Sequence, residues 1–224
     1  AAEAILRRTL QIDSTHADTW AHLGALQLAA RDFARARQHL ERATRLNAYH
    51  TEAHFSLANC LMRLGEKESG REMLRRFEML RSIDTEIVKY RDAIRNDPAD
   101  ASLHQALGLL YSKRGETDRA IQAYRQAIWR DTGFAAAHNN LGNLLLQQNR
   151  HQEAAQAYRA ALLADSDYAF AHNGIGTLNL LAGDAPAAVA SFERAVALDS
   201  ASLEFADNLT SARTLLQHTK EGIE

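Results

Sequence analysis

The chain has 224 residues, of which 46% are hydrophobic, 7% aromatic and 24% charged, and its formal net charge is −2. A charge this small gives no electrostatic reason to expect nucleic acid as a partner, and no apolar run approaches the roughly 18 residues of a membrane span. The single cysteine, Cys60, excludes an intrachain disulfide and leaves the cellular compartment open. We therefore expect neither nucleic-acid binding nor membrane insertion.

The sequence repeats with a period of 34 residues, and a fixed period of this length decides the architecture. The units cover 17–50, 51–84 (the weakest), 101–134, 135–168 and 169–202. In the clearest unit the first half carries His138, Leu141, Gly142 and Leu145, and the second half carries Ala154, Tyr158 and Ala161. Spacings of three and four place each set on one helical face, so each unit is predicted to be a pair of helices.

This pattern resembles the tetratricopeptide repeat, a helix–turn–helix unit with the signature W-x2-L-G-x2-Y…A-x3-F…P. The unit from residue 17 carries it as Trp20, Leu23 and Gly24, followed by Ala36, Leu40 and Ala43. The units from residues 101 and 169 carry it with Gly108 and Tyr124, and with Gly176 and Phe192. The resemblance implies an all-α fold, a right-handed α–α superhelix in which helix pairs stack on one another.

Residues 1–16 are predicted to form the second helix of a truncated repeat. This favours a fragment of a longer protein, and a native chain that starts with a capping helix is the alternative. In the unit 17–50, Arg31 stands where other units have Gly65, Gly115, Asn149 or Gly183. Because glycine and asparagine accept the left-handed cap of a helix and arginine is strained there, we expect a different turn at Arg31.

The repeat slips after residue 84, since the next clear unit begins 16 residues later, at Ala101. Residues 66–95 form either one long helix or two helices that break at Ser82–Asp84. We favour the break, with Asp84 as the N-cap and residues 85–100 as an irregular half-repeat helix. Leu74 would then occupy a place that normally holds a small residue, so we expect the superhelix to kink around residues 66–100.

The chain is predicted to end in a capping helix over 203–218, because a solenoid needs a terminal element with a polar outer face. Residues 219–224 are predicted to be a frayed tail.

No constellation of residues predicts catalysis, a metal or a cofactor. His54, His104, His138 and His172 share one place in four units, but equivalent helices lie about 10 Å apart, so these rings cannot share a metal ion. Cys60 and His54 point to different helical faces, and we expect Cys60 to be a small buried residue. We therefore expect a protein without enzyme activity.

The candidate binding residues are polar side chains of the first helices. In the family that this sequence resembles, peptides lie along the concave face against fixed places of these helices. Those places hold Asn59, Gln105, Asn139, Asn140, Asn143, Phe170, Asn173, Thr177, Asn208 and Ser211. Each asparagine has one acceptor and two donors, so a row of them can pair with an extended peptide backbone, and Phe170 can be an apolar anchor.

The favoured function is a protein–protein interaction scaffold or adaptor that binds a peptide segment of a partner in the concave groove. One alternative is the substrate-docking or regulatory arm of a larger enzyme, such as a glycosyltransferase. Another is self-assembly into a homo-oligomer through the exposed terminal helices. The residues that clamp a carboxylate-ended peptide in some family members do not occur together here, so an acidic C-terminal tail is not the expected ligand.

Overall fold

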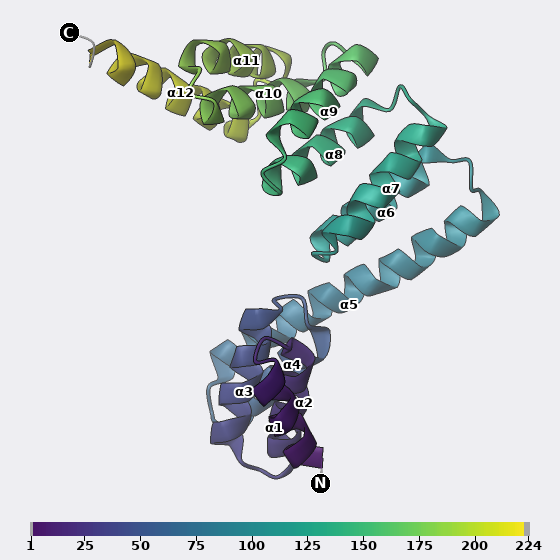
Figure 1. The fold of residues 1–224 in the computed structure, drawn as a ribbon, viewed down its shortest axis with the longest axis vertical. Helices are drawn as coiled ribbons and strands as arrows, with labels where there is room; N and C mark the ends of the chain where they lie inside the picture. Colours follow the sequence, from purple (N-terminus) through teal and green to yellow (C-terminus); the bar gives the residue numbers. More distant parts are fainter. Residues whose placement is uncertain (1, 222–224) are drawn as a thin grey trace. The chain divides into compact units, whose positions relative to one another are not determined.

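The computed structural model describes residues 2–221, which form twelve α-helices and no strand (Figure 1). The helices are α1 (Ala2–Ile12), α2 (Ala17–Ala29), α3 (Phe33–Leu46), α4 (Thr51–Arg63), α5 (Lys67–Asn96), α6 (Ala101–Lys113), α7 (Thr117–Arg130), α8 (Ala135–Gln147), α9 (His151–Ala164), α10 (Ala169–Leu181), α11 (Ala185–Leu198) and α12 (Leu203–Glu221). They divide between two compact units, Ala1–Val88 and Lys89–Glu224, which are described separately. None of the described helices combines the length and apolarity that crossing a bilayer requires.

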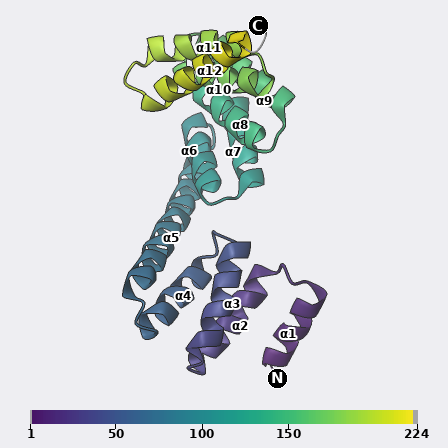
Figure 2. The same cartoon turned by 90° about the vertical axis from the view of Figure 1, so that its left-hand side faces the viewer.

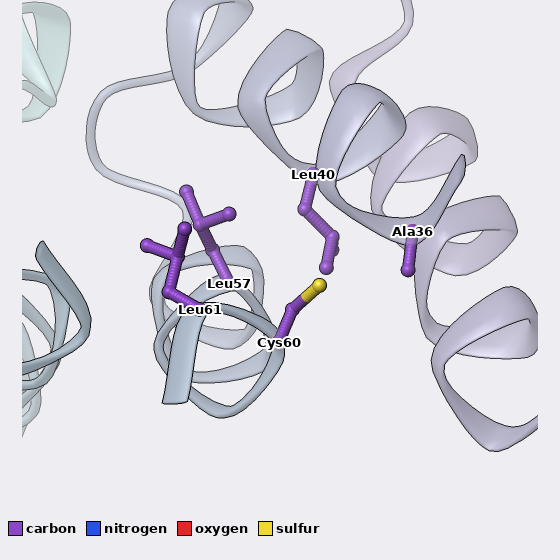
Figure 3. Close-up of a cluster of buried hydrophobic side chains, with 5 residues drawn as sticks. All are labelled: Ala36, Leu40, Leu57, Cys60 and Leu61. Atoms are coloured by element: carbon purple, nitrogen blue, oxygen red, sulfur yellow. The ribbon is translucent and has the colours of Figure 1, made fainter. Parts of the chain in front are cut away.

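In the first unit, α2 and α3 form a hairpin, and α4 packs against both of them (Figure 2). A Cβ atom added to Gly24 would lie 2.5 Å from Leu40 Cγ, so the absence of a side chain allows the two helices to cross closely. Leu40 in turn packs beside Cys60 of α4, with Ala36, Leu57 and Leu61 around them (Figure 3). The sulfur of Cys60 lies 3.2 Å from the Phe33 carbonyl oxygen, and burial raises the pKa of the thiol. Cys60 is thus a buried core residue.

The turn between α2 and α3 corrects one expectation. Arg31 adopts φ = 61°, the left-handed conformation that Asn149 and Gly65 also adopt at their turns. The Asp32 amide donates to the Gln27 carbonyl oxygen over 2.9 Å, as the Glu66 amide does to Leu61 in the next unit. The expectation of a different turn was therefore wrong, because the hydrogen bonds that close the helix end outweigh the local cost of an arginine there.

The region after residue 66 corrects a second expectation, because α5 is one continuous helix from Lys67 to Asn96, with no break at Ser82–Asp84. Serine and aspartate lower helix propensity only slightly, and the segment contains no proline to interrupt the hydrogen bonds. Thr85 Oγ donates to the Arg81 carbonyl oxygen over 2.9 Å across the predicted break. The boundary between the two compact units falls inside this helix, and the kink stays a prediction.

The second unit contains three regular hairpins, α6–α7, α8–α9 and α10–α11, followed by α12 (Figure 1). In each hairpin a glycine of the first helix faces a buried aromatic ring of the second. The pairs are Gly108 with Tyr124, Gly142 with Tyr158 and Gly176 with Phe192, and an added Cβ would lie 2.6, 2.7 and 2.6 Å from the ring. These contacts confirm the pattern of small and large residues that the sequence predicts.

The terminal helix α12 packs against α10 and α11 and buries Phe205, Leu209 and Ala212. Its other face is mostly exposed, as expected of a capping element. The helix continues to Glu221, so a frayed tail does not start at residue 219, and residues 222–224 lie outside the described part of the chain.

Candidate functional site

The fourth residue of the first helix of each repeat has a nitrogen-containing ring, a tryptophan or a histidine. A ring nitrogen forms a hydrogen bond with the backbone carbonyl oxygen six residues earlier, in the preceding turn. The contacts are Trp20 with Ser14 (2.9 Å), His54 with Ala48 (2.9 Å), His104 with Pro98 (3.3 Å), His138 with Thr132 (3.0 Å) and His172 with Ser166 (3.0 Å). Because a carbonyl only accepts, Nε2 of each histidine must donate. These histidines therefore connect successive repeats. Within residues 2–221, no group of three or more His, Cys, Asp or Glu side chains is placed so that it could hold a metal ion.

The first helices of successive hairpins form the inner face of the second unit. α6 contacts α8, α8 contacts α10 and α10 contacts α12, whereas no such contact joins α7 to α9 or α9 to α11 in the described chain. Helices that touch their equivalents lie on the inside of a curved stack, so α6, α8, α10 and α12 line its concave side. The predicted binding residues of this unit lie on these four helices.

A hollow of about 340 Å³ opens among α8, α10 and α12. Its lining contains five of the predicted residues and two others: Asn139, Asn140, Asn143, Phe170 and Asn173, with Tyr168 and Glu204. We call this site the amide hollow. The structure thus brings together asparagines that lie up to 34 positions apart in the sequence.

Internal hydrogen bonds orient the amides of α8. Tyr158 of α9 donates its hydroxyl hydrogen to Asn143 Oδ1 over 2.7 Å, and Asn139 Nδ2 donates to Asn140 Oδ1 over 3.5 Å. Asn140 and Asn143 therefore use their carbonyl oxygens inside the protein and leave their NH2 groups for other partners. Asn139 is only 3% exposed, and its Oδ1 atom has no hydrogen-bond partner among the described residues.

Asn173 of α10 connects two residues of α12. Its Oδ1 atom accepts a hydrogen bond from Asn208 Nδ2 over 2.9 Å, and its Nδ2 atom donates to Glu204 Oε1 over 3.3 Å. Asn173 is buried, and both ends of its amide are satisfied. Asn173 and Asn208 therefore hold the terminal helix in place, and Asn173 also fixes the Glu204 carboxylate at the edge of the hollow.

Aromatic rings form another side of the amide hollow. The ring centroids of Tyr168 and Phe170 are 5.8 Å apart, and Phe170 meets the buried ring of Phe205 edge-on at 5.3 Å. Phe170 remains 51% exposed, so its ring is accessible at the hollow. Burial, with a smaller contribution from Asp165, raises the pKa of Tyr168, so its hydroxyl stays protonated at neutral pH.

The remaining predicted residues lie elsewhere. Asn59 belongs to the first unit, beside Leu28 and Arg63 in a separate hollow. Gln105 lies on α6 and does not line the amide hollow. The hydroxyls of Thr177 and Ser211 donate to carbonyl oxygens of their own helices, over 3.1 and 2.9 Å.

The prediction missed Tyr168 and Glu204. Glu204 occupies the second place of the terminal helix, the place that Phe170 occupies in the unit before, so the same positional rule could have identified it. Tyr168 directly precedes α10 and lies outside the places considered. Gly174, which interrupts the row of asparagines, is also explained, because a Cβ there would lie 2.5 Å from the Tyr158 ring.

Comparison with known proteins agrees with this architecture. Three sequence profiles described as tetratricopeptide repeat match residues 27–77, 89–122, 106–169 and 139–202. No curated protein matches the chain by sequence. The structure of yeast Tom70 is similar, with a TM-score of 0.55 and 17% identity over 97% of this chain and 43% of that chain.

A chain of the APC/C hetero-tetramer Cut9–Hcn1 is also similar, with a TM-score of 0.51 and 17% identity over 94% of this chain and 45% of that chain. The present chain thus spans less than half the length of these two proteins, and at such identity the likeness concerns the fold. The profiles, the 34-residue period and the stacked helix pairs agree with one another. The chain belongs to the tetratricopeptide repeat family.

Proposed function

We propose that this chain is a protein-interaction module whose amide hollow binds an extended peptide segment of a partner protein. The observation that carries this proposal is the orientation of Asn140 and Asn143. Within the described residues each carbonyl oxygen accepts an internal hydrogen bond, and neither NH2 group has a partner. The hollow therefore offers two neighbouring donors that no group within residues 2–221 uses.

The spacing of these donors suits a peptide main chain. Residues three apart on a helix have Cβ atoms about 5–6 Å apart. In an extended peptide, carbonyl groups on the same side recur every second residue, about 6.6 Å apart. Asn140 and Asn143 can thus donate to two carbonyl oxygens of one strand, an interaction that is independent of the peptide's side chains.

Binding is best tested with a phage-displayed library of random nine-residue peptides, followed by fluorescence anisotropy with synthetic copies of the selected peptides. Asn140→Ala should weaken binding about two- to tenfold, the value of one hydrogen bond. Asn143→Ala should do the same. Each variant also removes the acceptor of an internal hydrogen bond, from Asn139 and from Tyr158 respectively, so thermal melting must accompany both. Gln122→Ala, an exposed amide on α7, is the matched control and should have no effect. Equal affinity of both asparagine variants and wild type for every selected peptide would contradict the proposal.

A further inference from the structure

We propose that the amide hollow selects a lysine or arginine side chain, so that the bound segment carries a positive charge at this point. The inference rests on the proposed function and adds the chemistry of the residue that enters the hollow. Three independent features of the lining support it: its charge, a buried acceptor without a partner, and its aromatic rings.

The charge of the hollow comes from Glu204. Neither α8 nor α10 contains an aspartate, glutamate, lysine or arginine, and no lysine or arginine lines the site. Glu204 Oε1 accepts from Asn173 Nδ2, which holds the carboxylate in place, while Oε2 has no hydrogen-bond partner among the described residues. Asp207 adds a second exposed carboxylate one turn later on α12. Within the described residues, the only Asp, Glu, Lys or Arg side chain in the lining is therefore the Glu204 carboxylate, which favours a cationic ligand.

The buried acceptor is Asn139 Oδ1. The side chain is 3% exposed and lines the hollow, and this oxygen has no donor within the described residues. Buried polar atoms of native proteins nearly always find a partner, and a donor on the ligand would supply one for this acceptor. Ammonium and guanidinium groups carry several donors and no acceptor, so their chemistry complements two acceptors of the lining, Asn139 Oδ1 and Glu204 Oε2.

The aromatic rings of the lining also favour a positively charged side chain. Tyr168 and Phe170 lie with their ring centroids 5.8 Å apart, and Phe170 is half exposed. The face of an aromatic ring carries negative partial charge and attracts cations, arginine most often. The methylene groups of lysine or arginine can also cover the exposed apolar ring. An acidic side chain would instead be repelled by Glu204, and an apolar one would desolvate the carboxylate and leave Asn139 unpaired.

The decisive variant is Glu204→Gln, which keeps an acceptor for Asn173 and removes only the charge. Its matched control is Glu153→Gln on α9, which makes the same change of charge in an exposed ion pair with Arg150. The random nine-residue library is selected on wild-type protein, and we expect lysine or arginine to be enriched at one fixed position of the selected peptides. Replacing that residue by acetyl-lysine or citrulline should weaken binding at least about fivefold, as loss of a charge-assisted hydrogen bond does.

Glu204→Gln should weaken the binding of the charged peptides by a similar factor and leave the binding of their neutral counterparts unchanged. Glu153→Gln should affect the binding of neither. Affinity for the charged peptides should also fall as the salt concentration rises from about 0.05 to about 0.5 M, because salt screens exposed charges. Selected peptides without basic enrichment, or equal binding of charged peptides to wild type and Glu204→Gln, would overturn the inference. In those cases a loss of binding in Asn140→Ala would still support the proposed function. A library from which wild-type protein selects no peptide would overturn both.

Discussion

Tyr158 donates its hydroxyl hydrogen to Asn143 Oδ1 over 2.7 Å, and this bond links the core of the repeat stack to the amide hollow. The ring is fully buried between two glycines, since an added Cβ would lie 2.7 Å from it at Gly142 and 2.5 Å at Gly174. Burial raises the pKa of Tyr158 to about 12, so the hydroxyl remains a donor at neutral pH. A side chain that packs two helix pairs together thus also orients an amide that lines the hollow.

Tyr158→Phe should therefore affect both stability and binding. The lost hydrogen bond should lower the free energy of unfolding by about 0.5–1.5 kcal/mol. The Asn143 amide should then turn freely and bind the selected peptides more weakly, which anisotropy at matched folded fractions would detect. Tyr124 is the matched control, because it has the same place in the preceding repeat and its hydroxyl has no hydrogen-bond partner among the described residues. Tyr124→Phe should leave peptide affinity unchanged, and equal effects of the two variants would contradict this role of Tyr158.

Gly174→Ala should destabilise the second unit although alanine favours helices. The new methyl group would overlap the Tyr158 ring, whose nearest carbons lie 2.5 Å from the Cβ position. Overpacking of this kind costs about 1–3 kcal/mol, more than the roughly 1 kcal/mol that alanine gains over glycine in a helix. Urea denaturation should show a lower midpoint. Gly70→Ala is the milder comparison, because its nearest neighbour is the flexible Met62 side chain at 3.0 Å. Stabilisation by Gly174→Ala would show that the ring can move away without cost.

The positions of the helix pairs could be predicted because each depends on residues close in sequence. Gly142 and Tyr158 lie 16 positions apart in one hairpin, and their complementary sizes recur in every regular unit. The continuity of α5 was harder to predict, since the 34-residue period is lost there. A break at Asp84 and an unbroken helix differ by only a few tenths of a kcal/mol in local propensity.

The amide hollow could be predicted only in part. The repeat positions that bind peptides in other family members identified Asn139, Asn143 and Asn173. The partners that orient Asn143 and Asn173 lie on other helices, Tyr158 on α9 and Glu204 on α12. Asn173 also illustrates a limit of positional rules, since both ends of its amide form hydrogen bonds with Asn208 and Glu204 of α12. Which asparagine is available to a ligand depends on three-dimensional neighbours that the period does not specify.

Stability should depend on pH through two of the histidines that hold the turns. Burial lowers the pKa of both His54 and His104, opposed at His54 by the hydrogen bond to Ala48 and reinforced at His104 by Arg130. The folded rings therefore stay neutral when the unfolded chain takes up protons, below about pH 6.5. The free energy of unfolding should fall as the pH drops through about 6.5 and stop falling, for these groups, below their folded pKa values.

Urea midpoints at about pH 7.5 and about pH 5.5 measure this dependence. The double variant His54→Gln/His104→Gln should lose less stability between the two pH values than wild type, because glutamine does not titrate. An identical loss in both proteins would show that other groups cause the acid sensitivity.

Arg31→Gly should stabilise the first unit, because Arg31 holds the left-handed conformation at φ = 61°. This conformation costs an ordinary L-residue about 1–2 kcal/mol, and glycine adopts it freely. The greater entropy of the unfolded glycine chain offsets about 0.5–1 kcal/mol of that gain, so the free energy of unfolding should rise by at most about 1.5 kcal/mol in urea denaturation. Asn149→Gly should raise the free energy of unfolding by less, since asparagine tolerates the left-handed conformation better than arginine does. Arg42→Gly in the middle of α3 should instead lower stability by about 1 kcal/mol. A less stable Arg31→Gly protein would mean that the arginine side chain makes a compensating interaction at the turn.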